Sequence, residues 1–247
     1  FVTLAGEIER CLEGSGSGSA LAKAIEDGRT VAGLPFGQLA ATRRHEAAEA
    51  LRNWQRLRQR RPFEKEVPSL VGALLSYLGF ALSVGDSLHE ESRGQDWIWL
   101  RASMSASGLA KPIPQLGHQA QNRYDVVCFW DRPGVDTITA RLSELHLSVQ
   151  TVIAVYLGRL TPRQRRDVNR AFRQQHLSVA ILDEVLLFYL AQEADARLGP
   201  FLRCSLPYSA VNPYTPFQAG DVPPEMFFGR EDMARQIQDP YGSCILY

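Results

Sequence analysis

The segment VAILDE, residues 179–184, places two acidic residues directly after an apolar run. A buried strand that ends in Asp-Glu is typical of a Walker B segment, in which the Asp holds Mg²⁺ and the Glu orients a water molecule. The sequence has no GxxxxGK[ST] loop that would bind phosphates beside such a strand. We therefore favour a structural role, in which Asp183 caps the following helix and Glu184 lies at its positive end.

A second chemical pattern is the arginine-rich segment TPRQRRDVNRAFRQQH, residues 161–176. At about 100° per residue, four of its arginines fall within an arc of roughly 80° on one helix face. These four are Arg163, Arg166, Arg170 and Arg173. Val168 and Phe172 fall on the opposite side and should pack on a sheet. Four exposed guanidinium groups can bind the phosphates of nucleic acid. A solvated face and a surface that contacts another domain are the alternatives.

Other catalytic and metal-binding patterns are missing from the sequence. The five histidines show no HxxxH or HExxH spacing, which argues against a zinc site. No GxSxG segment offers a nucleophilic serine. The four cysteines form no CxxC pair, so we interpret them as reduced thiols, with Cys128 a small core residue of an apolar strand.

Composition gives little information about partners. Lys+Arg and Asp+Glu both number 27, so only the distribution of charge can indicate a binding surface. The most apolar stretch, residues 178–191, is short and contains two acidic residues, which argues against a membrane span. The N-terminus has no basic-then-apolar signal pattern. We therefore expect a cytoplasmic protein that does not associate with membranes.

Helices and strands must position these residues, and the N-terminal part is expected to be helical and peripheral. It contains a Gly/Ser stretch and then the segment ATRRHEAAEALRNWQRLRQR, a helix that Pro62 should stop. Residues 43–61 carry seven arginines against two glutamates, a local charge of about +5. A nucleic-acid contact is one interpretation of this helix. A solvated basic face is the other, and we favour it.

From residue 63 the pattern changes. The helix in FEKEVPSLVGALLSYLG should end at Gly79. Three strand-like runs follow, FALSV, DWIWLRAS and YDVVCFW. In the second run, Trp97, Trp99 and Arg101 are expected to share one face, because side chains alternate along a strand.

After Trp130, helices and apolar strands alternate. We expect a helix over residues 134–145 with Asp136 as its N-cap. The arginine-rich helix should begin with Thr161 as N-cap and Pro162 at its first position. A last helix follows Asp183 and should close at Gly199. Uninterrupted apolar strands between these helices predict a mixed or parallel sheet that is covered on both faces.

The order of elements over residues 63–191 resembles the Mrr-like branch of the restriction-endonuclease fold. Members of this family open with a Phe-Glu helix that ends in Leu-Gly-Phe or Leu-Gly-Tyr, as FEKEVPSLVGALLSYLGF does. They close with strand, helix, strand and helix, as TVIAVYLGRLTPRQRRDV and LSVAILDEVLLFYLA do. Three meandering strands between these parts carry an Asp and a (Glu/Gln)-x-Lys pair that bind Mg²⁺ and activate water. The resemblance implies an α/β fold with a restriction-endonuclease-like mixed sheet flanked by helices.

The catalytic set that the resemblance implies is incomplete in this sequence. If YDVVCFW is the catalytic strand, the (Glu/Gln)-x-Lys positions fall on Cys128 and Trp130, which cannot replace a carboxylate and a lysine. Asp96 and Asp125 are the candidates for the metal-binding Asp. We therefore expect a domain that has lost catalysis and contacts DNA or a protein partner. An active Mg²⁺-dependent DNA endonuclease domain is the first alternative, and a non-catalytic protein-interaction module is the second.

The last segment, NPYTP…VPPEMFFGREDMARQI…GSCILY, resembles the entry to a P-loop NTPase domain of the STAND or AAA+ kind. Those proteins carry a Phe-x-Gly-Arg-Glu before a short helix and a strand that leads into the Walker A loop. Gly229 and Arg230 match the part that lies near the nucleotide base. The resemblance implies that only a longer protein would bind ATP, and that this chain by itself hydrolyses none.

These resemblances give a domain plan and a functional expectation. Residues 1–62 form an N-terminal helical region, residues 63–199 the restriction-endonuclease-like domain, and residues 200–247 a proline-rich extended linker with the start of an NTPase domain. We expect the chain to be the N-terminal effector or sensor domain of a large bacterial STAND-type NTPase, of the anti-phage defence or signalling type. Its expected partners are DNA, the downstream NTPase domain and further copies in an oligomer.

Overall fold

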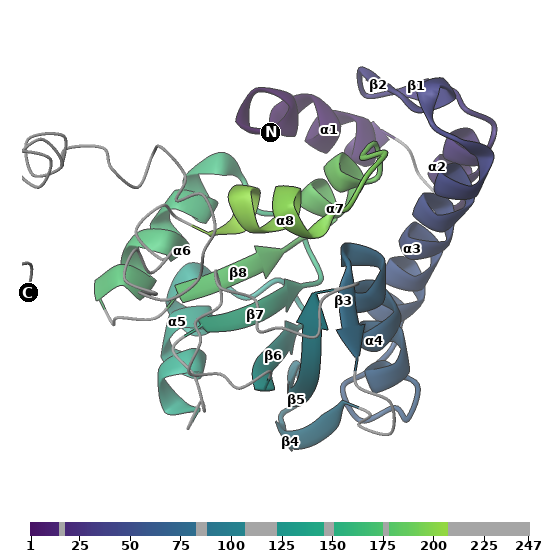
Figure 1. Ribbon diagram of the computed structural model, residues 1–247. Helices are drawn as coiled ribbons and strands as arrows, with labels where there is room; N and C mark the ends of the chain where they lie inside the picture. Colours follow the sequence, from purple (N-terminus) through teal and green to yellow (C-terminus); the bar gives the residue numbers. More distant parts are fainter. Residues whose placement is uncertain (15–17, 83–87, 107–122, 146–150, 175–177, 207–247) are drawn as a thin grey trace, which may run out of the picture.

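A six-stranded mixed β-sheet lies at the centre of the structure (Figure 1). The computed structural model describes residues 1–14, 18–82, 88–106, 123–145, 151–174 and 178–206. The strands of this sheet are β3 (Phe80–Leu82), β4 (His89–Arg93), β5 (Trp97–Ala106), β6 (Arg123–Phe129), β7 (Thr151–Tyr156) and β8 (Ser178–Leu182).

Helices flank the sheet, as the sequence predicted. In the described part of the chain they are α1 (Val2–Gly14), α2 (Gly18–Glu26), α3 (Ala41–Gln59), α4 (Val67–Leu78), α5 (Val135–Glu144), α6 (Pro162–Gln174), α7 (Glu184–Leu190) and α8 (Leu198–Ser205). A small hairpin of β1 (Thr30–Val31) and β2 (Leu34–Pro35), followed by the 3₁₀ turn η1 (Phe36–Gln38), lies between α2 and α3.

The sheet is antiparallel on one side and parallel on the other. Both β3 and β4 pair with β5 in the antiparallel sense, β3 near the C-terminal end of β5 and β4 nearer its N-terminal end. β6 is antiparallel to β5, and β7 and β8 continue the sheet in parallel. The three strand-like runs therefore form a meander, and α5 and α6 connect the parallel strands that follow.

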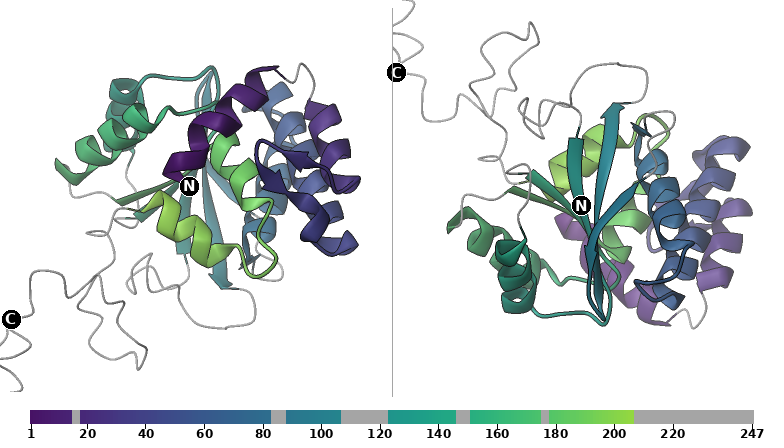
Figure 2. Two further views of the ribbon diagram at one scale, coloured as in Figure 1. Left: turned by 90° about the horizontal axis from the view of Figure 1, so that it is seen from above. Right: turned by 90° about the horizontal axis from the view of Figure 1, so that it is seen from below.

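The two faces of the sheet bury two separate groups of apolar side chains. Trp97 and Trp99 pack with residues of α5 and α6 on one face. Ile98 and Leu100 belong to the larger cluster on the other face, which α1, α3, α4, α7 and α8 cover. Figure 2 shows α5 and α6 on one side of the sheet and the remaining helices on the opposite side. The predicted alternation along the strand DWIWLRAS is thus confirmed for its tryptophans.

The N-terminal region is not peripheral, contrary to the sequence-based expectation. Ile8 of α1 and Trp54 of α3 are buried in the same cluster as the strand residues. The indole Nε1 of Trp130 donates a hydrogen bond to the carbonyl oxygen of Leu57 at 3.2 Å, which fixes the end of α3 to the sheet. The described part of residues 1–62 therefore shares one hydrophobic core with the α/β region that follows it.

Several predicted helix ends are confirmed. Gly79 ends α4 with φ of 102°, a left-handed conformation that favours glycine. Pro162 begins α6, and the Thr161 hydroxyl accepts a hydrogen bond from the Gln164 amide at 3.2 Å. The helix predicted over residues 134–145 is confirmed as α5, but its predicted N-cap is wrong, because Gly134 occupies that position and Asp136 lies in the first turn. The negative charge of Asp136 still lies near the N-terminus of α5, where the helix dipole favours an acidic side chain.

The end of the domain also differs from the prediction. α7 stops at Leu190 instead of reaching Gly199, because the run QEAD, residues 192–195, has no large apolar side chain to bury. Gly199 and Pro200 lie inside α8, whose Phe201 and Leu202 are buried in the core. Pro200 is tolerated there because the amides of a helix's first turn have no partner within the helix. The segment predicted as an extended linker thus starts with a packed helix, and residues 207–247 lie outside the described residues.

Candidate functional site

The Asp-Glu pair after β8 has the structural role that the sequence predicted. Asp183 is fully buried, and its Oδ1 accepts a hydrogen bond from the Leu186 amide at 2.9 Å, which caps α7. Its Oδ2 accepts one from the Leu160 amide at 2.9 Å, and Arg165 Nη2 lies 2.7 Å from Oδ1. Both carboxylate oxygens are therefore engaged by protein donors.

Glu184 connects three parts of the chain. Its carboxylate accepts hydrogen bonds from Arg58 Nη1 at 3.2 Å and from Arg159 Nε at 2.7 Å. Arg159 also donates to the carbonyl oxygen of Leu12 in α1 at 3.0 Å. This partly buried ion-pair network connects α1, α3 and α7.

The two candidate metal ligands lie at different positions along β5, one before its start and the other beside its middle. Asp96 immediately precedes Trp97, the first residue of the strand, whereas Asp125 of β6 stands opposite Arg101. Positions 96 and 101 are separated by roughly 16 Å along a strand. The structure therefore does not bring Asp96 and Asp125 together.

Asp125 is fully buried among protein groups. Its Oδ1 accepts a hydrogen bond from the Trp99 indole at 3.0 Å, and Arg101 Nε lies 3.5 Å from the same oxygen. Arg101 also pairs with Glu91 at 3.0 Å. Among the residues that the structure describes, no group of three or more His, Cys, Asp and Glu side chains could hold a metal ion.

The positions that the family resemblance assigns to (Glu/Gln)-x-Lys lie in the core. Cys128 is fully buried, and burial raises the pKa of its thiol well above its usual range. Trp130 is also buried and donates its indole hydrogen bond to α3. Neither side chain can take part in metal-assisted hydrolysis.

The arginine face of α6 is exposed as predicted, and the Asp167 carboxylate lies between two of its arginines. The Arg163 and Arg170 side chains are 87% and 73% exposed, and they lie 3.9 and 3.5 Å from Asp167. Arg166 is exposed too. Arg173 is in the last turn of α6, and its side chain lies outside the described part of the structure. One side of α6 therefore presents at least three guanidinium groups to solvent.

The buried face of α6 is confirmed, with one residue that the prediction missed. Val168 and Phe172 pack on the sheet. Arg165 is buried, pairs with Asp183, and holds its guanidinium carbon 5.1 Å from the centre of the Phe1 ring. It precedes Val168 by three residues and Phe172 by seven, so the helical periodicity already placed it on the packed face.

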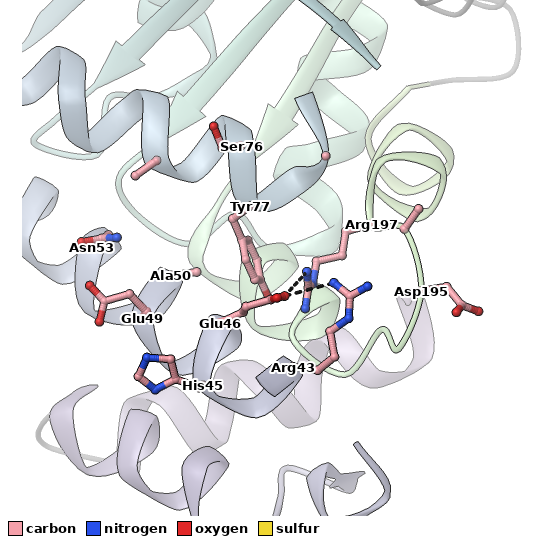
Figure 3. A pocket seen from close by; sticks show the side chains of 13 residues that line it. Arg43, His45, Glu46, Glu49, Ala50, Asn53, Ser76, Tyr77, Asp195 and Arg197 are labelled. Carbon is pink, nitrogen blue, oxygen red and sulfur yellow. Dashed lines mark hydrogen bonds and ion pairs between the residues drawn. The ribbon is translucent and has the colours of Figure 1, made fainter. Parts of the chain in front are cut away.

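A pocket of about 570 Å³ lies between α3, α4 and the segment that leads into α8 (Figure 3). Arg43 Nη1 and Arg197 Nη1 both donate to Glu46 Oε2, at 3.0 and 3.2 Å. The guanidinium carbon of Arg197 lies 4.2 Å from the centre of the Tyr77 ring. Figure 3 shows these four side chains converging in the pocket.

The electrostatics of this pocket follow from that arrangement. Partial burial raises the pKa of the Glu46 carboxyl, but the hydrogen bonds from Arg43 and Arg197 outweigh it, so the pKa lies below its usual value. Burial raises the pKa of Tyr77 to about 12, although the charge of Arg197 opposes the shift. Glu46 is thus ionised and Tyr77 neutral near pH 7.

No pattern in the sequence indicates this pocket. Arg43 and Glu46 were part of a helix interpreted as a solvated basic face, and Arg197 was part of a predicted continuous helix. Arg197 lies 151 positions from Glu46 in the chain, and the two residues come together only in the folded protein. The pocket therefore depends on a tertiary contact that no local pattern predicts. Gly229 and Arg230, the predicted nucleotide-binding residues of a longer protein, lie outside the described residues.

No helix in the described part of the chain is long and apolar enough to cross a membrane. The chain matches no family model, no curated protein and no solved structure. Its function must therefore be inferred from its own residues and their arrangement.

Proposed function

We propose that the chain is a non-catalytic sensor or effector domain with a restriction-endonuclease-like arrangement, and that the exposed face of α6 contacts nucleic acid. The observation that carries the proposal is the contrast between two surfaces of the same sheet. Three exposed arginines stand on α6, with Asp167 as their near counter-charge. The strand positions where the resemblance expects catalytic residues hold buried Cys128 and Trp130.

The order of elements supports this proposal. A helix, an antiparallel meander and then two parallel strands joined by helices is the succession that the resemblance implies. Loss of catalysis in such a domain leaves its capacity for phosphate contacts intact, because these depend on exposed guanidinium groups and not on a metal site.

The proposal extends to a longer protein. We infer that the chain precedes a STAND-type NTPase domain in a bacterial defence or signalling protein, and that ATP binding belongs to that domain. The support is the sequence around Gly229 and Arg230 alone. A gene that continues past Tyr247 without a Gly-Lys-Ser/Thr loop would refute this part and leave the α6 proposal standing.

Fluorescence anisotropy with a labelled DNA duplex across salt concentrations tests the α6 contact. Three to four phosphate contacts predict a slope of log K against log salt of about −3. The variant Arg166→Glu/Arg170→Glu should weaken binding to every sequence and reduce the slope by about one for each lost contact. Arg29→Glu is a control for charge reversal at an exposed arginine away from α6, because Arg29 is 70% exposed and lies on the connection between α2 and α3.

Two outcomes would reject parts of the proposal. Absence of DNA and RNA binding at low salt would favour the protein-interaction module. Mg²⁺-dependent cleavage of plasmid or linear DNA that is lost in Asp96→Ala or Asp125→Ala would show an active endonuclease and refute the non-catalytic interpretation.

A further inference from the structure

Arg43 and Arg197 form a clamp around a single carboxylate oxygen. Their Nη1 atoms reach Glu46 Oε2 at 3.0 and 3.2 Å from two elements that are distant in sequence. Two guanidinium groups that converge on one oxygen are an arrangement suited to an oxyanion, because charge-assisted hydrogen bonds from arginine favour carboxylate and phosphate.

Arg197 has hydrogen-bonding capacity that the protein does not use. Its side chain is only 4% exposed, and its Nε and Nη2 are buried without a hydrogen-bond partner. The Tyr77 hydroxyl in the same pocket is also buried without one. Buried donors that lack an acceptor are costly, so three such groups in one place indicate a site made for additional acceptor oxygens.

The two partners of Arg197 differ in their freedom to move. Tyr77 stacks its ring on the Arg197 guanidinium and holds it in place. Glu46 has a side chain that is 46% exposed, so its carboxylate can rotate into solvent. Release of Glu46 would free the Nη1 atoms of both arginines, and these already line the pocket.

The other charged groups of the pocket are engaged elsewhere or point away. Glu49 pairs with Arg52 at 3.4 Å, and His45 lies 3.3 Å from Glu26. Asp195 points away from Glu46 (Figure 3). Glu46 is therefore the one carboxylate of the described pocket lining that occupies the clamp.

We infer that this pocket binds the oxyanion of a small polar molecule, a phosphate or carboxylate group held by Arg43 and Arg197, and that Glu46 acts as an internal competitor for that position. The volume of about 570 Å³ exceeds what an inorganic anion needs and falls in the range of pockets for small organic ligands. Asn53 and Ser76 supply neutral polar groups for the rest of such a molecule. The inference is independent of the nucleic-acid contact proposed for α6.

Calorimetric titration with inorganic phosphate and with succinate, at ionic strength matched with chloride, tests the inference and distinguishes the two anion classes. Glu46→Gln removes the competitor while the amide oxygen can still accept a hydrogen bond, so the affinity should rise about tenfold. Arg43→Ala should lower the affinity about tenfold, and because Arg43 is 38% exposed the fold should persist. Arg197→Lys keeps the charge but loses the forked donors, and it should bind as weakly as Arg43→Ala.

Glu49→Gln is the matched control, because it changes the same charge in the same pocket without a contact to the clamp. It should alter the dissociation constant far less than Glu46→Gln. Equal gains in the two variants would indicate a general charge effect and overturn the inference. Lack of binding of both anions to the wild type and to Glu46→Gln would overturn it as well. Arg166→Glu should leave phosphate binding unchanged, which separates this site from the α6 face.

Discussion

Arg165 of α6 reaches Asp183 at the end of β8 with 2.7 Å between Nη2 and Oδ1, and both side chains are buried. Replacing Arg165 by Ala would leave a buried carboxylate without its cation, a change that typically costs about 3–5 kcal/mol. Urea denaturation should therefore show a large loss in the free energy of unfolding. Arg166→Ala, the exposed neighbour, should change it by no more than about 0.5 kcal/mol. Equal effects of the two substitutions would contradict the assigned role of Arg165.

The same pair shows which part of the structure could be predicted from the sequence and which could not. The capping role of Asp183 was predictable because cap and helix are adjacent in the chain, so local hydrogen bonding decides the outcome. Arg165 lies on the packed face by helical periodicity, but its partner could not be predicted. That partner depends on how α6 crosses the end of β8, which is a tertiary relationship.

The ends of helices also divide into those that local sequence predicts and those that depend on tertiary packing. Gly79 ends α4 as predicted, because a left-handed residue after an apolar helix is encoded locally. Pro200 was misleading, because a proline is compatible both with an extended linker and with a first helical turn. The helix forms because it buries Phe201 in the core, and no local sequence pattern predicts that burial.

Gly79 and Gly6 should respond to alanine with opposite signs. A Cβ at Gly79 would lie 3.3 Å from Leu198 Cβ, and φ of 102° is unfavourable for alanine, so Gly79→Ala should cost about 1–2 kcal/mol. Gly6 lies inside α1 and has no atom within 4 Å of an added Cβ. Gly6→Ala should stabilise the protein by about 0.5–1 kcal/mol through helix propensity. Thermal unfolding of both variants measures this contrast, and a shift of the same sign would refute it.

Glu46 should make the stability depend on pH in the acid range. Its pKa is lowered from an ordinary value of 4.5, so its contribution is present above that pH and is lost as the pH falls through the folded-state value. Glu46→Gln should therefore show a flatter loss of stability below about pH 4.5 than the wild type. Parallel curves for Glu46→Gln and the wild type would contradict the assigned ion pairs.

Substitutions of Asp125 and Asp96 should change the free energy of unfolding by different amounts, although the family resemblance proposes both residues as metal ligands. Asp125 is fully buried and accepts the Trp99 indole hydrogen bond at 3.0 Å, with Arg101 Nε 3.5 Å away. Asp125→Ala would leave the indole and the guanidinium without this carboxylate, so unfolding should become easier by about 2–4 kcal/mol. Asp96→Ala should cost much less, because the one contact described for Asp96 is its carbonyl oxygen, which accepts a hydrogen bond from the Trp130 amide at 2.7 Å and persists in alanine.

The same two variants test whether either carboxylate serves a metal ion. Because Asp125 is held by protein donors and Asp96 lies before the start of β5, away from Asp125, Mg²⁺ should not raise the unfolding temperature of the wild type beyond the shift that matched NaCl ionic strength produces. A Mg²⁺-specific stabilisation that disappears in Asp96→Ala would identify a metal site at the start of β5. A Mg²⁺-specific stabilisation that disappears in Asp125→Ala would mean that Arg101 releases the Asp125 carboxylate to the metal ion. This comparison should be made at a denaturant concentration where the Asp125→Ala variant is still folded. Either result would restore the endonuclease interpretation over the non-catalytic one.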